Sequence, residues 1–463
     1  ILMKIAKIYS VIIFSSFIFS QNTSTINGFV RDNRNGEPIS YANVFLSNTN
    51  LGAATNRDGY FVISNIPNGE YEINATMIGY GLFKQDINII EDKPVRLDIR
   101  LIEEVIQTSE VLVTAERQKF ERSMESSQIS LDIREINSAP AFIEPDVFRT
   151  LQMLPGVQTT SDFSSALYVR GSTPDQNLIM LDGIAVYNPY HLGGIFSTFN
   201  TDAIKEADFH AGGFPARYGG RMGAILNVLN REGNTGKVKG SANISLISSK
   251  GLIEGPLPNW KGMKGSWMVS GRRTYFDTVI DALKIPIGQK SDGSNIYFQF
   301  PYHFYDYQVK VNLDVDQNHR LTYSRFYGDD IVDFSFQETL EYSGASVDVE
   351  SKTGFGVKWP WGNHTNGLTW RWIIAPDIVA KTFLSHSRYR FDFELNSLDR
   401  NTYTFTDSTI VLFSDITFRA FDIIKDNTLE TELTWQAAKG HTVTSGFQVK
   451  DVNFDLGLDI SFA

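Results

Sequence analysis

In residues 303–315, apolar and polar side chains alternate without a break, so an extended strand would have one apolar and one polar face. The apolar face would carry Tyr305, Tyr307, Val309, Val311, Leu313 and Val315. The polar face would carry Asp306, Gln308, Lys310, Asn312 and Asp314. Soluble sheets use the same period, but their strands average about 5–6 residues. This run reaches the ~9–11 residues that a tilted strand needs to cross a membrane, and it therefore predicts a lipid-facing strand.

Similar alternation recurs through residues 233–463 and predicts about nine strands of alternating direction. We expect them near 237–247, 250–256, 264–275, 303–315, 319–335, 363–375, 377–394, 415–435 and 441–456. Short turns are expected at 316–319, 375–377 and 436–441, and longer loops at 276–302, 336–362 and 395–414. Outer-membrane barrels have one such short end and one long end. An odd strand number leaves an open edge that lipid does not tolerate, so we expect the first part of a larger barrel.

The first 21 residues have the composition of a secretory signal peptide. Lys4 and Lys7 precede an apolar stretch from Ile8 to Phe19, and Ser20 offers a small residue for processing. The alternative is a membrane anchor, but the stretch is shorter than the ~20 residues of a spanning helix. No later run approaches that length, so a membrane protein of this sequence has to span with strands.

Residues 24–101 alternate apolar and polar residues between turn signals at Asn35-Gly36, Asp58-Gly59 and Asn68-Gly69. About seven short strands in this length predict a small β-sandwich. The stretch resembles the carboxypeptidase regulatory-like domain through GFV, GEPISYANV, GAATNRDGYF, IPNGEYEI and IGY. It contains no His, no Cys and no nucleophile paired with a base, so we expect no peptidase activity from it.

Residues 111–232 predict a compact, turn-rich α+β unit. Two short apolar runs are joined by Asp182-Gly183, a hairpin signal because both positions favour a positive φ. Residues 144–154 show helical spacing of apolar side chains and end at Pro155-Gly156.

The order of short motifs in this unit resembles the plug domain of TonB-dependent outer-membrane receptors. The matching segments are EVLVTA (110–115), LPGV (154–157), VRG (169–171), LDG (181–183) and ARYGG with GAILNV (216–228). The resemblance implies a plug over residues 119–232, inside a transmembrane barrel of about 22 strands that begins at residue 233. The whole would be a mainly β protein, in the order β-sandwich, α+β plug and barrel, surrounded by outer-membrane lipid.

Residues 102–118 join the sandwich to the plug. By resemblance they contain the TonB box, which is Glu110, Val111, Leu112, Val113, Thr114 and Ala115. An exposed extended segment can add itself as an edge strand to a partner's sheet. The resemblance identifies that partner as TonB, with its inner-membrane energising complex. The alternative is an ordinary linker or the first strand of the plug.

Arg170 and Asp182 are the most suggestive charges of the plug. They would belong to an ion-pair network between plug and barrel wall, or else Asp182 occupies its turn while Arg170 caps a local carbonyl. The stretch 187–194 would form an apical loop that faces an incoming ligand, or else it packs internally, and the sequence does not choose. Its candidate ligand-facing residues are Tyr187, Asn188, Tyr190 and His191.

Composition and motifs argue against several function classes. The net charge of −11, without a basic stripe, argues against a nucleic-acid partner. The chain has no Cys, its seven His are scattered without HExxH spacing, and no GxSxG segment is present. GNTGKV (233–238) superficially resembles a phosphate loop, but the spacing is wrong and no Ser or Thr follows Lys237. We expect no catalytic, cofactor or metal site, and therefore no enzyme.

The sequence thus predicts energy-coupled uptake of a scarce ligand across a Gram-negative outer membrane, with the N-terminal domain in the periplasm. A siderophore, an oligosaccharide, a peptide and cobalamin are all compatible with the resemblance, and so is a surface lipoprotein lid. One alternative is an outer-membrane signalling receptor that does not transport. The other is a secreted β-rich binding or adhesion protein.

Overall fold

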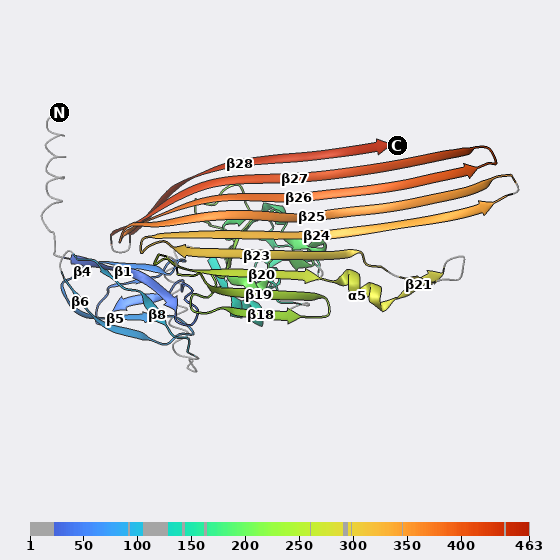
Figure 1. Cartoon of the computed structure of the whole chain (residues 1–463). Helices are drawn as coiled ribbons and strands as arrows, with labels where there is room; N and C mark the ends of the chain where they lie inside the picture. Colours follow the sequence, from blue (N-terminus) through green and yellow to red (C-terminus); the bar gives the residue numbers. More distant parts are fainter. Residues whose placement is uncertain are drawn as a thin grey trace, which may run out of the picture.

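A computed structural model describes residues 23–90, 93–104, 128–140, 144–161, 164–259, 261–289, 295–297, 299–344, 346–438 and 441–462. The chain is mainly β and forms three parts in sequence order (Figure 1), which we call the sandwich, the plug and the wall. The expected signal peptide (1–21) and TonB box (110–115) lie outside the described residues. Among the residues that are described, no helix is long and apolar enough to cross a membrane.

The sandwich consists of two sheets. The first is ordered β4 (Tyr60–Pro67), β1 (Thr23–Asp32) and β7 (Val95–Arg96), and β8 (Ile99–Leu101) also pairs with β1. The second is ordered β3 (Gly52–Ala54), β2 (Asn43–Leu46), β5 (Gly69–Thr76) and β6 (Phe83–Ile89). Both sheets bury side chains in one apolar core, so the predicted β-sandwich is confirmed. Its members include Ile26, Val30 and Ile99 from the first sheet, and Val44, Leu46, Ile73 and Ile89 from the second.

The plug is built on a five-stranded sheet. The strand order is β13 (Ile184–Ala185), β12 (Leu178–Leu181), β17 (Ile225–Asn230), β16 (Ile204–His210) and β9 (Gln128–Asp132). The predicted hairpin is confirmed, because Asp182 and Gly183 connect β12 to β13 with φ values of 52° and 83°. Helices α3 (Ile133–Ser138) and α4 (Val147–Leu151) pack on this sheet around the buried Phe148 ring.

Short elements complete the plug. They are β10 (Val157–Gln158), β11 (Tyr168–Val169), β14 (Tyr190–His191), β15 (Phe196–Ser197), η1 (Pro174–Gln176), η2 (Leu192–Gly194) and η3 (Thr201–Ala203). Helix α4 is shorter than the expected 144–154, because the Asp146 side chain caps it by accepting from the Phe148 and Arg149 amides. The same carboxylate accepts from the Ser197 amide at 2.7 Å, which ties the helix to β15.

The wall is a nine-stranded sheet in simple sequence order, as predicted. Its strands are β18 (Lys239–Ile244), β19 (Ser248–Pro256), β20 (Lys264–Thr274), β23 (Tyr302–Asp314), β24 (His319–Ser343), β25 (Asp348–Ala375), β26 (Ile378–Thr404), β27 (Thr409–Ala438) and β28 (His441–Phe462). Each pairs antiparallel with the next, and the three expected short turns are confirmed.

Two of the three long loops expected from the sequence are wrong. In place of loops at 336–362 and 395–414, β24 and β26 continue into tight connections with β25 and β27. The backbone of each stretch finds its hydrogen-bond partners in the neighbouring strand, so the sheet is extended even where the alternation of apolar and polar residues is lost, as at 410–413. The third stretch, 276–302, contains α5 (Phe276–Leu283) and the hairpin of β21 (Pro286–Gln289) with β22 (Asn295–Tyr297).

The polar face of β23 lies against the plug, and the apolar face points away from it. Gln308 and Asn312 are almost completely buried on this inner face, whereas outward-pointing Val315 and Tyr323 are partly exposed. In the half of the wall nearer the sandwich, large exposed apolar residues gather on the outer face. They include Leu368, Trp370, Trp372, Leu384, Leu429, Leu433, Trp435, Val443, Phe447 and Val449. This is the alternation of a strand between lipid and a polar interior.

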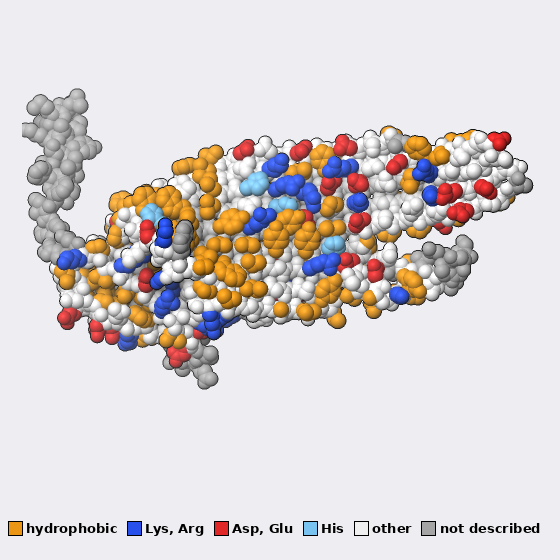
Figure 2. Space-filling view, in the orientation of Figure 1, with side chains coloured by type: hydrophobic (Ala, Val, Ile, Leu, Met, Phe, Trp, Pro, Cys, Tyr) orange, Lys and Arg blue, Asp and Glu red, His pale blue; other side chains and the backbone are white. Residues whose placement is uncertain are grey.

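Farther from the sandwich, the polarity of the two faces is exchanged. On β28 the outer positions change from Val443, Phe447 and Val449 to Asp451, Asn453, Asp455 and Asp459. The inner positions change from Thr442, Thr444, Gln448 and Lys450 to Val452, Phe454, Leu456, Leu458 and Ile460. Figure 2 shows hydrophobic side chains over the half of the sheet nearer the sandwich and acidic ones toward the far ends of the long strands. We therefore expect the lipid-facing part of the wall to end at this exchange.

We expect Leu384→Arg, on the outer face of β26, to destabilise the wall by about 2–4 kcal/mol, because the guanidinium would enter lipid. Leu398→Arg is the matched control. It lies on the same face of the same strand beyond the exchange of polarity, and should cost less than about 0.5 kcal/mol. Urea unfolding of the full-length protein in lipid vesicles measures both. Equal costs would contradict the placement of the lipid boundary.

Candidate functional site

The hairpin turn of the plug is joined to the wall by an ion pair. Lys310 Nζ on β23 lies 2.8 Å from Asp182 Oδ1 and donates to the Asn230 carbonyl at 2.9 Å. The Asp182 carboxylate also accepts from the Asn230 amide at 3.0 Å and from its side chain at 2.9 Å. Asp182 therefore occupies its turn and at the same time binds the wall, while its role in a network that yields during transport stays a prediction.

A second polar cluster surrounds His191 on β14. His191 Nδ1 lies 2.6 Å from Asp330 Oδ2 on β24, and Nε2 lies 3.4 Å from Asp306 Oδ2 on β23. Arg272 on β20 pairs with Asp306 at 2.9 Å. The imidazole stacks on Phe304 at a ring distance of 3.8 Å. Two wall strands, β23 and β24, thus contact the buried plug histidine, and Arg272 of β20 pairs with one of the carboxylates that it meets.

The other candidate apex residues also contact their surroundings directly. The Tyr187 hydroxyl donates to Asp426 on β27 at 2.9 Å, and the Asn188 amide donates to the Tyr389 hydroxyl on β26 at 3.3 Å. The Tyr190 ring packs on Phe148 inside the plug at 5.2 Å.

For His191, the interpretation as a ligand-facing residue is wrong. Its side chain is completely buried, because the carboxylates of the wall close over it. The sequence could not show this burial, since Asp330 and Asp306 are more than a hundred residues away along the chain.

Arg170 is not brought into the network of Asp182. It sits in a turn with φ of 50°, its backbone amide donates to the Gly156 carbonyl at 2.8 Å, and its side chain is exposed. Within the described part of the chain, Arg170 makes no ion pair. Its functional role stays a prediction.

Sequence reasoning did not single out the wall side of the interface. The residues concerned are Arg272, Asp306, Lys310, Asp330, Asn363 and Asp426. They carried a usable signal, because each charge or amide occupies an inner position of a strand whose outer positions are largely apolar. What the sequence lacked was the partner of each one.

Beyond the plug apex, the inner face of the wall forms an aromatic surface. Trp361 and Phe391 pack in one cluster with Phe196 of the plug. The Trp359 ring lies 5.9 Å from that of Phe391 and 5.8 Å from that of Phe393. We call this surface, above the plug on the long strands, the aromatic vestibule. It offers ring faces to a ligand. Among the described residues, no group of His, Cys, Asp and Glu could hold a metal ion.

Two family models match this chain. The CarboxypepD_reg-like domain matches residues 26–113, and the TonB-dependent receptor plug domain matches residues 130–225. The first match reaches Val113 and so overlaps the predicted TonB box, although the last strand of the sandwich, β8, ends at Leu101.

Individual proteins are also similar to this chain. The chain is 24% identical over 387 residues to the vitamin B12 transporter BtuB of Photobacterium profundum, which covers 73% of this chain and 60% of that protein. Among solved structures, a mutant of the ferric enterobactin receptor PfeA of Pseudomonas aeruginosa is similar, with 12% identity, coverage of 74% and 60%, and a TM-score of 0.34. The outer membrane transporter YddB of Escherichia coli shows 9% identity, coverage of 72% and 58%, and a TM-score of 0.35. The chain thus spans about 60% of the length of these relatives.

The chain therefore contains a plug domain of the TonB-dependent receptor type. A CarboxypepD_reg-like domain precedes this plug in the sequence.

We expect the Asp182–Lys310 pair to show strong coupling in a double-mutant cycle. Asp182→Asn keeps a side chain that tolerates the positive φ of the turn, and Lys310→Met keeps the length of the lysine. Each single change leaves a buried partner, so the double mutant should recover about 1–3 kcal/mol. The measurement is the opening free energy of residues 178–186 by native-state hydrogen exchange in the full-length protein.

The control cycle uses Arg217→Met and Glu430→Gln, which also join plug to wall, at 3.2 Å, but where the arginine is 40% exposed. Its coupling should stay below about 1 kcal/mol because water screens the pair. Equal coupling energies in the two cycles would contradict the expectation that the buried Asp182–Lys310 pair attaches the plug more strongly than the exposed Arg217–Glu430 pair does.

The His191 cluster predicts a pH dependence of plug docking. Burial alone would lower the pKa of His191, but the carboxylates of Asp330 and Asp306 raise it above its ordinary value of 6.5, against the opposing charge of Arg272. The Tyr302 hydroxyl faces the same carboxylate of Asp330. A raised folded-state pKa stabilises docking fully below about 6.5, and this contribution disappears as the pH rises through the higher folded-state value.

The measurement is hydrogen exchange of residues 190–197 across pH 5–9 (about the range that brackets a His), corrected for the intrinsic rate. His191→Gln should remove the trend, whereas His386→Gln, on the outer face, should leave it unchanged. A trend that persists in His191→Gln would assign it to another group.

Proposed function

We propose that this protein is an energy-coupled uptake receptor of a Gram-negative outer membrane, which imports its ligand without chemical change. One observation carries the proposal. A plug domain of the TonB-dependent type is attached by buried ion pairs to the polar inner face of a sheet whose outer face is apolar. Such a sheet is suited to lipid on one side and to a removable protein filling on the other. The barrel of about 22 strands remains part of this proposal.

Ligand would enter from the side of the aromatic vestibule. Its walls present Trp359, Phe391 and Phe393, and its floor is formed by the plug near Tyr187 and Asn188. Aromatic faces with amide and hydroxyl groups suit ring-bearing, partly polar molecules. Cobalamin, a siderophore, an oligosaccharide and a peptide are the probes to compare. A lipoprotein lid over the vestibule is a further proposal.

Coupling would come from the opposite side. The short turns of the wall and the sandwich lie at the same end of the molecule, which we assign to the periplasm (Figure 1). There TonB would pair with residues 110–115 by strand addition and transmit work from the inner membrane. The contacts that this work has to break are the pairs of Asp182 and His191 with the wall.

We expect Leu112→Pro to abolish uptake and to leave ligand binding intact, because proline removes a backbone donor from the added strand. Gln118→Pro, in the same linker outside the box, is the matched control and should retain uptake. The measurement is accumulation in cells, against binding to isolated outer membranes, of whichever of the four probe classes binds the wild-type protein. Normal accumulation by Leu112→Pro would remove the box assignment, while binding without accumulation by the wild type would favour a signalling receptor.

A further inference from the structure

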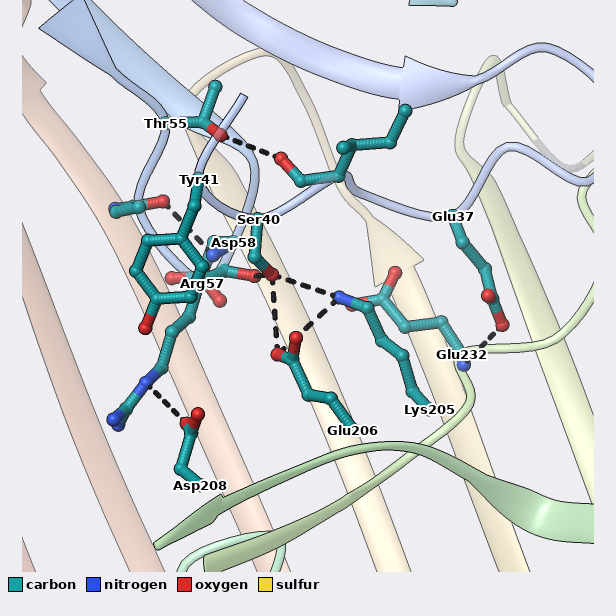
Figure 3. A network of polar contacts seen from close by, with 12 residues as sticks. Glu37, Ser40, Tyr41, Thr55, Arg57, Asp58, Lys205, Glu206, Asp208 and Glu232 are labelled. Atoms are coloured by element: carbon teal, nitrogen blue, oxygen red, sulfur yellow. Dashed lines mark hydrogen bonds and ion pairs between the residues drawn. The ribbon is translucent and has the colours of Figure 1, made fainter. Parts of the chain in front are cut away.

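The sandwich contacts the plug through a polar surface on strand β16 (Figure 3). Arg57 Nε lies 2.9 Å from Asp208 Oδ2, and the Asp208 carboxylate is fully buried. Ser40 Oγ donates to Glu206 Oε1 at 3.2 Å and lies 3.3 Å from the donating Lys205 Nζ. We call these five residues the clasp.

The clasp grips an interior strand of the plug. β16 lies between β17 and β9 in the five-stranded sheet. Ala207 and Phe209 of this strand point into the apolar core of the plug, whereas Glu206 and Asp208 point to the sandwich. A domain that holds β16 therefore holds the body of the plug rather than a loop on its surface.

The same sandwich contacts the wall through a small apolar cluster, with ion pairs such as Arg31–Asp314 and Asp58–Lys381 around it. Phe29 and Tyr60 form one buried cluster with Ile373 of β25. The Arg371 guanidinium lies 4.5 Å from the centre of the Phe29 ring. The Tyr60 hydroxyl donates to the carbonyl of Pro376, in the short turn after β25, at 2.7 Å. The sandwich thus contacts both the plug and the wall where these two parts meet.

The two surfaces differ in how readily they separate. Charged and hydroxyl groups of the clasp regain hydrogen bonds and solvation from water once they part, and this offsets much of what the contacts contribute. The cluster of Phe29, Tyr60 and Ile373 would expose apolar area that water does not compensate. Of the two attachments, the one to the plug is therefore expected to open first.

We propose that the CarboxypepD_reg-like domain is a bracket: it stays on the short turns of the wall and retains the plug through the clasp until uptake begins. This rests on the proposed function, because it supposes that the plug moves relative to the wall. In this mechanism the domain is neither a spacer nor a passive extension of the periplasmic end. It adds to the resistance that the coupling partner has to overcome at the plug–wall ion pairs.

The first test measures spontaneous opening of the plug without ligand or partner. The full-length protein is placed in planar lipid bilayers, and potassium chloride current is recorded at a fixed urea concentration that loosens the plug. Arg57→Gln should raise the open fraction about tenfold, since it leaves Asp208 without its ion-pair partner. Arg34→Gln is the matched control, because Arg34 pairs at 3.0 Å with Glu103 of the same domain, and it should change nothing. Equal opening of the two variants would overturn the proposal.

The second test links the domains covalently and does not depend on how Arg57→Gln folds. The chain contains no cysteine, so introduced pairs are unique. Ser40→Cys with Glu206→Cys, joined by a short bismaleimide, fixes the sandwich to the plug. Asn35→Cys with Thr235→Cys fixes the sandwich to the segment that enters the wall, where the Thr235 amide donates to the Asn35 carbonyl at 2.7 Å.

The first link should reduce the open fraction about tenfold or more, and the second should leave it unchanged, because the bracket already remains on the wall. When Phe29→Ala loosens the attachment to the wall, the first link should lose its effect. An unchanged current with the first link, or an equal reduction by both links, would refute the bracket. The current is recorded without TonB. If Leu112→Pro takes up ligand normally, the proposed coupling through residues 110–115 is refuted, but the bracket is still tested independently by these currents.

Discussion

The structure depends on one constraint: charges buried between plug and wall need partners. A wall that faces lipid on one side carries its polar residues on the other, and the plug then covers them. Lys310 and Arg272 are almost completely buried, yet each meets a carboxylate within hydrogen-bond distance. An isolated buried charge would be too costly to keep, so plug and wall have to match in register. The position of the Asp182 turn follows from this requirement.

The same constraint explains why the wall changes character along its strands. Where the outside is lipid, the inner face can be polar because the plug supplies partners. Where the strands project beyond lipid, the outside carries Asp451, Asp455 and Asp459, and the inside carries Phe454, Leu456 and Leu458. Both faces change at the level where Tyr187 meets Asp426. The plug apex, the expected lipid boundary and the start of the aromatic vestibule therefore lie at the same level along the strands of the sheet.

Local pattern predicted most of the architecture. The alternation of 303–315, the Asp182-Gly183 turn and the short connections near 316–319 and 375–377 are all decided by near neighbours, and all are present. The loops expected at 336–362 and 395–414 failed for a different reason. In 336–362 the apolar residues, such as Phe336, Leu340 and Trp359, occupy the inner face, whereas 395–414 has no regular alternation and contains four consecutive apolar residues at 410–413. A search for strands with an apolar outer face therefore predicts loops in both stretches.

Pairings between distant segments could not be predicted from the sequence. In the sequence, His191 is a polar residue next to aromatic residues. Only the fold brings Asp306 and Asp330 to its two ring nitrogens. Arg57 lies in a turn of the sandwich, where a charged side chain is usually solvated. Only the fold shows that Asp208 of the plug lies beside it. The alternation of apolar and polar residues predicts which face of the sheet a residue occupies, whereas its ion-pair or hydrogen-bond partner depends on the tertiary fold.

A plug that has to move is better held by polar contacts than by an apolar core. Its own interior, around Phe148 and Phe209, is apolar and stays together as a unit. Its attachments to the wall and to the sandwich include ion pairs and hydrogen bonds, which water can replace one after another as they part. The wall also contacts the plug through smaller apolar clusters, such as Phe196 with Trp361 and Ala203 with Leu252. Separation would expose these smaller clusters but not the plug interior, so the largest buried apolar cluster moves as one unit. The polarity of the contact surfaces between the three parts, rather than their area, therefore decides which parts of this protein separate and which move together.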